Sequence, residues 1–170
     1  MDGENEIKQA YASLLDADFE KAIEWFEQAV RVDPANADFH YKLSMTYARS
    51  NKLDKAIEHA IRASELRPDH EAYRYHAATL RARALMLEAG KRMEAGEPLR
   101  SALNLLTEAV KLDPLLTEAH LLLAVTYGEL ERYEPALAAA NDALKLDPHN
   151  AEAIRLAGEF DRKLNRYSRH

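Results

Sequence analysis

The chain of 170 residues is 47% hydrophobic and 31% charged, with a formal net charge of −6 and no cysteine. This composition is typical of a soluble helical protein, and it excludes disulfides, thiolate metal ligands and a cysteine nucleophile. An acidic chain without a dense basic face is a poor partner for a phosphate backbone, so we expect no nucleic acid among its partners.

The sequence shows no sign of a membrane segment. No apolar run approaches the length of about 18 residues that a membrane-spanning helix needs. The start MDGENEIK lacks the basic and apolar segments of a secretion signal. We therefore expect no membrane partner and a cytoplasmic location.

Apolar residues recur at the spacing of amphipathic helices along most of the chain. His40, Leu43 and Tyr47, for example, fall on one stripe of such a helix. Polar turns and prolines separate the stripes, because proline cannot continue a helix. We predict nine helices, over about residues 5–15, 19–32, 36–49, 53–66, one from near 69 with an extension over 81–96, then 98–112, 116–130, 133–146 and 150–166.

The helix–turn–helix pattern repeats. Its closing prolines are Pro34, Pro68, Pro114 and Pro148, at separations of 34, 46 and 34 (68−34, 114−68 and 148−114). Small residues recur in phase with them, at Ala22, Ala29, Ala56, Ala60, Ala63, Ala102, Ala109, Ala136, Ala140 and Ala143. A tetratricopeptide unit is a helix–turn–helix of about 34 residues, so the longer interval indicates one unit with about 12 additional residues.

The chain resembles the tetratricopeptide-repeat family, whose signature is W-x2-L-G-x2-Y followed by A-x3-F and A-x4-P. The match in the last unit is His120-x2-Leu123-Ala124-x2-Tyr127 with the alanines and Pro148 that follow. His40 and His120 stand where the family has tryptophan, so we interpret both as packing residues. The resemblance implies an all-α, right-handed α-solenoid of about four units, over residues 3–36, 37–70, 71–116 with a 12-residue helical extension, and 117–150, plus a C-terminal capping helix over 151–166.

The extension is the most individual feature of the sequence. Leu85, Met86 and Met93 lie on one side of it, and the opposite helix has no matching extension to cover that side. These residues either fold over the following loop or contact a partner or a second copy of the chain, as a homodimer would. Gly90 adds the alternative of a kink or an early helix end.

No motif points to catalysis. The sequence has no glycine-rich phosphate loop, no HExxH and no GxSxG, and its histidines are scattered. His70 and His76 lie six residues apart, on different sides of a helix, which is a poor arrangement for metal. We expect a protein that is not an enzyme and needs no cofactor or metal.

The resemblance implies that the first helices of the units line a concave groove. Carried over by repeat position, the groove residues are mainly aromatic and apolar with two arginines at the edge: Tyr11, Tyr41, Met45, Arg49, Tyr75, Thr79, Arg83, Leu121 and Val125. The family's carboxylate clamp for acidic chaperone tails is not indicated, because its early positions hold Ile7, Tyr11 and Tyr41 instead of basic and amide residues.

We therefore predict a non-enzymatic adaptor or scaffold that binds a protein or peptide in this groove. Its partner would be an amphipathic helix or an extended segment with apolar anchors, flanked by an acidic residue. The alternatives are a client-specific chaperone, resembling bacterial secretion chaperones of this fold, and a self-assembly module that uses the 81–96 extension.

Overall fold

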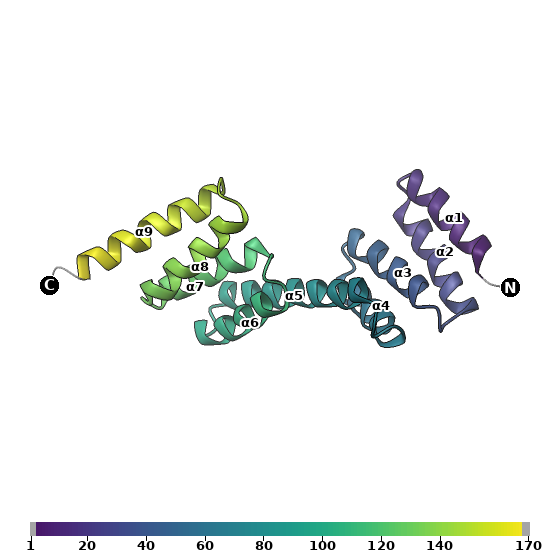
Figure 1. The fold of residues 1–170 in the computed structure, drawn as a ribbon, viewed down its shortest axis with the longest axis horizontal. Coiled ribbons are helices and arrows are strands. Elements are labelled where there is room, and N and C mark those ends of the chain that lie inside the picture. Colours follow the sequence, from purple (N-terminus) through teal and green to yellow (C-terminus); the bar gives the residue numbers. More distant parts are fainter. Residues whose placement is uncertain (1–2, 168–170) are drawn as a thin grey trace. The chain divides into compact units, whose positions relative to one another are not determined.

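The computed structural model describes residues 3–167, and this range contains nine helices and no strand (Figure 1). The helices are α1 Glu4–Leu15, α2 Phe19–Val32, α3 Ala37–Arg49, α4 Leu53–Leu66, α5 Glu71–Glu94, α6 Leu99–Leu112, α7 Thr117–Glu129, α8 Tyr133–Leu146 and α9 Ala151–Tyr167. They confirm the prediction of nine helices, with ends displaced by a few residues.

Four helices end in the same type of turn, which depends on a few consecutive residues. A residue with positive φ follows the helix, and the next amide donates a hydrogen bond to a carbonyl five residues back, as in a Schellman motif. The positive-φ residues are Ala17, Asn51, Gly96 and Glu131. The bonds run from Asp18 to Ser13, Lys52 to Tyr47, Glu97 to Arg92 and Arg132 to Tyr127, at 2.9–3.0 Å. These turns define four helical hairpins: α1–α2, α3–α4, the end of α5 with α6, and α7–α8.

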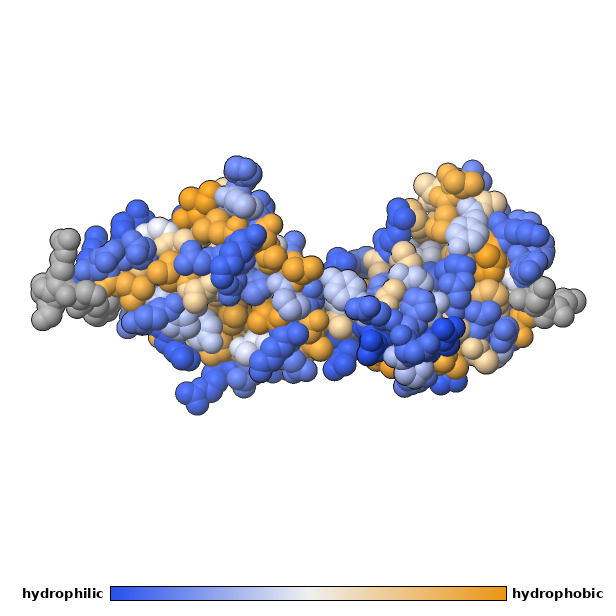
Figure 2. Space-filling model, in the orientation of Figure 1, coloured by the Kyte–Doolittle hydropathy of each residue, from blue (hydrophilic) through white to orange (hydrophobic). Residues whose placement is uncertain are grey.

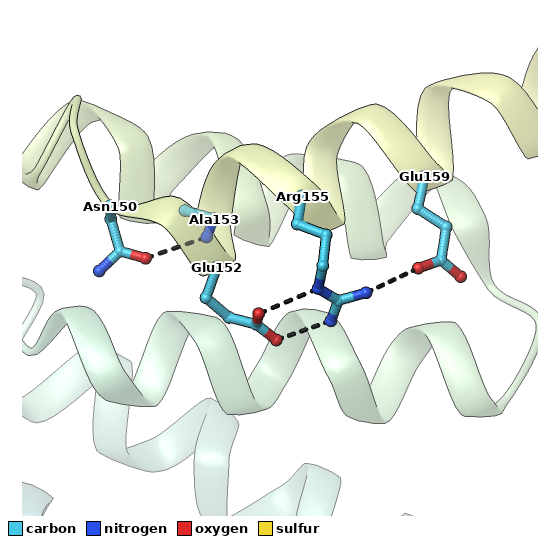
Figure 3. Close-up of polar contacts among 5 residues, drawn as sticks. All are labelled: Asn150, Glu152, Ala153, Arg155 and Glu159. Carbon is cyan, nitrogen blue, oxygen red and sulfur yellow. Dashed lines mark hydrogen bonds and ion pairs between the residues drawn. The ribbon is translucent and has the colours of Figure 1, made fainter.

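Side-chain caps fix several helix starts. Asp18 accepts a hydrogen bond from the Lys21 amide at the start of α2. Asn150 does the same for α9, accepting from the Ala153 amide at 3.0 Å (Figure 3). Pro98 is the residue directly before α6.

The chain divides into two compact units, residues 1–80 (unit 1) and residues 81–170 (unit 2). Adding 80 to the bounds of α2, α3 and α4 gives the bounds of α6, α7 and α8, and the starts of α5 and α9 differ by the same offset. Each unit is thus two hairpins followed by one further helix. The last helix is the start of α5 in unit 1 and α9 in unit 2. The prediction of one array over the whole chain stays a prediction.

The core of unit 1 lies between its hairpins. It is built from small and aromatic side chains, with Ala56 and Ala60 of α4 fully buried beside Leu43 and Tyr47 of α3. Ser44 is fully buried as well, and its hydroxyl donates to the Ala56 carbonyl at 2.6 Å, so the two helices approach closely. The small-residue stripes predicted from the sequence therefore carry the helix contacts.

The apolar side of residues 81–96 is covered within unit 2, by neighbouring helices instead of by the following loop or a partner. This end of α5 is the first helix of the first hairpin in unit 2, and its apolar side enters the core. Ala89 is fully buried with Leu106 of α6, while Met86 and Met93 are half-buried against the same cluster. Leu85 packs on a second cluster. The helix also continues through Gly90 to Glu94, so an early end at Gly90 is wrong.

On the face drawn in Figure 2, hydrophilic side chains cover much of each unit, and apolar side chains gather in smaller patches. This distribution is ordinary for a folded helical protein, whose surface always retains some apolar area. Scattered apolar side chains on the surface therefore do not indicate a binding site, whereas an apolar pocket does.

Candidate functional site

The structure brings four of the nine predicted groove residues into one pocket of unit 1. The pocket has a volume of about 280 Å³. It is lined by the predicted Tyr11, Tyr41, Met45 and Arg49, and by Leu14, Phe26, Asp38, Lys42 and Thr46, which the sequence analysis did not name. α1 supplies Tyr11 and Leu14, α2 supplies Phe26, and α3 supplies the rest. Asp38 and Lys42 could have been found, because they lie within one turn of Tyr41 on the same helix.

The pocket has an apolar floor and aromatic walls. Phe26 is almost fully buried, and the Tyr11 ring meets it edge-on with 6.0 Å between ring centres. The Tyr41 ring packs against the Tyr73 ring, with 4.8 Å between the ring centres. Tyr11 is 44% exposed and Met45 is 43% exposed, so an incoming side chain can contact both. Aromatic rings fixed in this way bury area at little entropic cost.

The two cations of the pocket are in different electrostatic situations. Lys42 forms an ion pair with Asp38, one turn away. Burial alone lowers the pKa of Lys42, but hydrogen bonds and charge interactions with Asp38 and Tyr11 together outweigh burial, so the net pKa is raised. Arg49 lies with its guanidinium carbon 5.0 Å from the centre of the Phe19 ring. Within residues 3–167, Arg49 has no carboxylate partner.

The other five predicted groove residues lie outside this pocket. Tyr75 and Thr79 are on the unit 1 part of α5. Tyr75 is 53% exposed, and the Thr79 hydroxyl is buried and has no hydrogen-bond partner among the described residues. Arg83, Leu121 and Val125 belong to unit 2, where Leu121 and Val125 are half-buried against the core. A single binding strip through all nine residues stays a prediction.

Unit 2 has a pocket of about 270 Å³ between α7 and α9. Of the predicted groove residues it contains Val125 alone; its rim is charged, with Glu129, Arg155, Glu159 and Lys163. Arg155 forms ion pairs with both Glu152 and Glu159, at 2.7 and 3.1 Å (Figure 3). The sequence predicts a capping role for α9, and in agreement Leu156 and Phe160 of this helix are buried.

The two histidines in the tryptophan positions are confirmed as packing residues. His40 and His120 are buried, and each donates from Nε2 to the carbonyl of the preceding closing proline, Pro34 at 3.1 Å and Pro114 at 3.0 Å. In unit 1, Nδ1 of His40 then accepts from Nδ1 of His59 at 2.9 Å, which requires the accepting His40 ring to be neutral. Burial, followed by the nearby His40, lowers the pKa of His59.

Within residues 3–167, no three His, Asp or Glu side chains lie together in a way that could hold a metal ion. In the same range, no helix has both the length and the apolar content that crossing a membrane requires.

Family models of the tetratricopeptide repeat match residues 13–84 and residues 92–151, which together are more than half of the chain. The chain belongs to the tetratricopeptide-repeat family. Proteins of this family generally act as interaction modules and not as enzymes. The four hairpins described above are its tetratricopeptide repeats. Each pair of repeats is followed by one further helix, which is the start of α5 in unit 1 and α9 in unit 2.

Curated tetratricopeptide relatives are much longer proteins. The chain is 26% identical over 136 residues to a UDP-N-acetylglucosamine–peptide N-acetylglucosaminyltransferase of Giardia intestinalis, covering 80% of the chain and 8% of that enzyme. It is 38% identical over 61 residues to the peroxisomal targeting signal receptor of Saccharomyces cerevisiae, covering 36% of the chain and 10% of the receptor. The chain thus spans a tenth or less of the length of these relatives.

Solved tetratricopeptide structures share the fold. MamA from Desulfovibrio magneticus is 18% identical with a TM-score of 0.58, covering 96% of the chain and 86% of MamA. YrrB, described as a TPR protein with an unusual peptide-binding site, is 23% identical with a TM-score of 0.50, covering 86% of the chain and 69% of YrrB. At these identities the similarity is one of fold.

Proposed function

We propose that the chain is a non-enzymatic adaptor that binds a protein or peptide segment in the pocket of unit 1. The observation that carries this proposal is the combination of an apolar floor, two half-exposed anchoring side chains and an arginine at the rim. Tyrosine and arginine are frequent anchors of binding energy in interfaces, and apolar concave sites with a few polar groups are the usual form of ligand sites.

Two of the relatives support this proposal. The yeast relative is named as a receptor for a targeting signal, and YrrB is described as having a peptide-binding site. For the present chain, the partner that fits best is an amphipathic helix or an extended segment with an apolar anchor. Either form can place one large side chain into a pocket formed by two neighbouring helices.

The proposal is tested by capture from a lysate of the cells that produce the protein. We compare the wild-type chain with the double variant Tyr11→Ala and Met45→Ala, and identify retained proteins by mass spectrometry. The matched control is Ile61→Ala, a side chain of α4 that is 37% exposed and lies outside the pocket lining. A protein retained by the wild type and the control, but lost from the double variant, is the expected result.

Identical retention by all three proteins would contradict the proposal. The same experiment addresses the chaperone alternative, because a captured partner that becomes insoluble in cells lacking the chain would be a dependent client.

The homodimer predicted through Leu85, Met86 and Met93 loses its basis, because these side chains pack within unit 2.

A further inference from the structure

Arg49 is the one cation of the unit 1 pocket that no carboxylate neutralises within the described residues. The other cation, Lys42, is engaged by Asp38. The face of Phe19 orients the Arg49 guanidinium without cancelling its charge. The rim of the pocket therefore offers a fixed positive charge with free hydrogen-bond donors.

The pocket volume limits what can occupy it. At about 280 Å³ it lies just below the range of ordinary small-molecule and cofactor sites, which is roughly 300–1,000 Å³. Its lining of Phe26, Tyr11 and Met45 favours an apolar group. A single large apolar side chain, presented by a peptide, fits both the size and the chemistry.

The spacing of α3 fixes where an acidic group must lie. Tyr41, Met45 and Arg49 are on successive turns of one helix, each about 5–6 Å from the next along the axis. An extended peptide advances about 3.3 Å per residue. A carboxylate one or two residues from the apolar anchor therefore reaches Arg49.

Unit 2 presents a different surface at the equivalent positions. Tyr41, Lys42 and Met45 correspond there to Leu121, Leu122 and Val125, all half-buried against the unit 2 core. Arg49 corresponds to Glu129. The equivalent site thus carries the opposite charge at its rim, and it would repel the same peptide.

We infer that unit 1 selects a peptide in which a large apolar residue fills the pocket and an aspartate or glutamate one or two residues away pairs with Arg49. This inference rests on the proposed function, because it names the partner of that same pocket. Unit 2 does not bind this motif, so the chain binds one such peptide. An Arg–carboxylate pair is directional, and it therefore contributes specificity beyond that of the apolar anchor.

The test is a selection from a phage-displayed random peptide library on the full chain. Wild type is compared with Arg49→Glu, with Met45→Glu, and with Glu129→Ala as the matched control at the equivalent position of unit 2. Met45→Glu places a carboxylate one helical turn before Arg49, where it satisfies the guanidinium internally. Arg49 and Met45 are both exposed, so these variants retain the fold, which circular dichroism checks.

Peptides selected by wild type and by Glu129→Ala are expected to carry an apolar residue with an acidic residue one or two positions away. Binding of the best peptide weakens by about tenfold or more in Arg49→Glu and in Met45→Glu. Replacing its acidic residue by glutamine weakens binding to wild type severalfold but strengthens binding to Arg49→Glu, because it removes the repulsion between the two carboxylates.

Each failure has a distinct reading. Selected peptides that lose binding in Tyr11→Ala with Met45→Ala, yet show no acidic preference or keep it in Arg49→Glu, overturn the inference and leave the proposed pocket function standing. If no peptide is selected, or selected peptides bind the Tyr11→Ala, Met45→Ala variant as well as wild type, both fall. Peptides that require Glu129 instead would place the site in unit 2 and also overturn the inference.

Discussion

At the scale of single residues, the two units differ at pairs of contacting positions where both side chains are different. Ser44 and His76 are joined by a 2.9 Å hydrogen bond in unit 1, and the equivalent residues of unit 2 are Ala124 and Leu156, which need none. The Ser44 hydroxyl already donates to Ala56, so His76 donates to it from Nε2. The same helix–helix contact is thus made by a hydrogen-bonded polar pair in unit 1 and by an apolar pair in unit 2.

A second exchange concerns the contact between the third helix and the last helix of each unit. Ala48 and Leu80 stand in unit 1 where Gly128 and Phe160 stand in unit 2. A Cβ atom added at Gly128 would lie 2.6 Å from the Phe160 ring, which is closer than real contacts allow. Phe160 is almost fully buried, so its ring would have to shift within the packed interior to admit the Cβ atom.

We therefore expect Gly128→Ala to destabilise unit 2 by about 1–2 kcal/mol, because overpacking costs about 1–3 kcal/mol and the better helix propensity of alanine returns part of it. Adding Phe160→Leu, which copies unit 1, should restore most of the loss. Thermal unfolding followed by circular dichroism measures both. The control is Gly158→Ala on α9, where a Cβ meets nothing within 4 Å. It should be neutral or stabilising, and destabilisation of similar size there would contradict the packing explanation.

At the scale of elements, α5 is one continuous helix of 24 residues that serves two purposes. Its first part covers the second hairpin of unit 1, with Tyr73, Ala77 and Leu80 buried. Its second part begins the first hairpin of unit 2. The sequence shows an insertion at this place, but the role of the inserted residues depends on which side chains they meet. Those partners come from α6 and α7, later in the chain.

Lysine at Met86 and Met93 distinguishes a core role from an interface role. Because both side chains pack against the unit 2 core, we expect the double variant to lower the free energy of unfolding by about 1–3 kcal/mol, without changing the molecular mass in solution. Light scattering after size exclusion gives the mass, and circular dichroism gives the stability. Leu87→Lys, at an exposed position of the same helix, is the control and should change neither. A reduced mass with unchanged stability would restore the self-association hypothesis.

At the scale of the whole molecule, the partly buried, hydrogen-bonded histidines His59 and His76 lie in unit 1. Burial lowers the pKa of His59 and of His76 below the ordinary value of 6.5. The equivalent residues of unit 2 are Ala139 and Leu156. The single tryptophan, Trp25, lies in unit 1, so its fluorescence reports on the unit that contains these histidines.

Unit 1 should therefore lose stability as the pH falls. Below about pH 6.5 the unfolded chain binds protons that the folded histidines resist, and stability decreases wherever the unfolded state binds more protons. Urea unfolding followed by Trp25 fluorescence should show a lower midpoint at about pH 6 than at about pH 7.5. The variant with His59→Ala, His76→Leu and Ser44→Ala copies unit 2 and should lose this dependence. Equal midpoints for the wild type at both pH values would contradict the prediction.

Features that depend on a few neighbouring residues could be read from the amino-acid order alone. Helix periodicity, the closing prolines and the turn positions are local, so nine helices, the repeat and the family were predictable from them. The packing roles of His40 and His120 followed from their place in the repeat. Tyr11, Tyr41, Met45 and Arg49 were found in the same way, because groove positions recur with the repeat.

The meeting of distant residues became known from the three-dimensional fold. The division of α5 between two units, the cover of Met86 and Met93, and the contact of Gly128 with Phe160 all join residues that are far apart in the chain. The Asp38–Lys42 ion pair belongs to the candidate site because side chains of α1 line the same pocket. Packing between helices depends on the shape of both partners at once, and a repeat pattern fixes the position of a residue without fixing its neighbours.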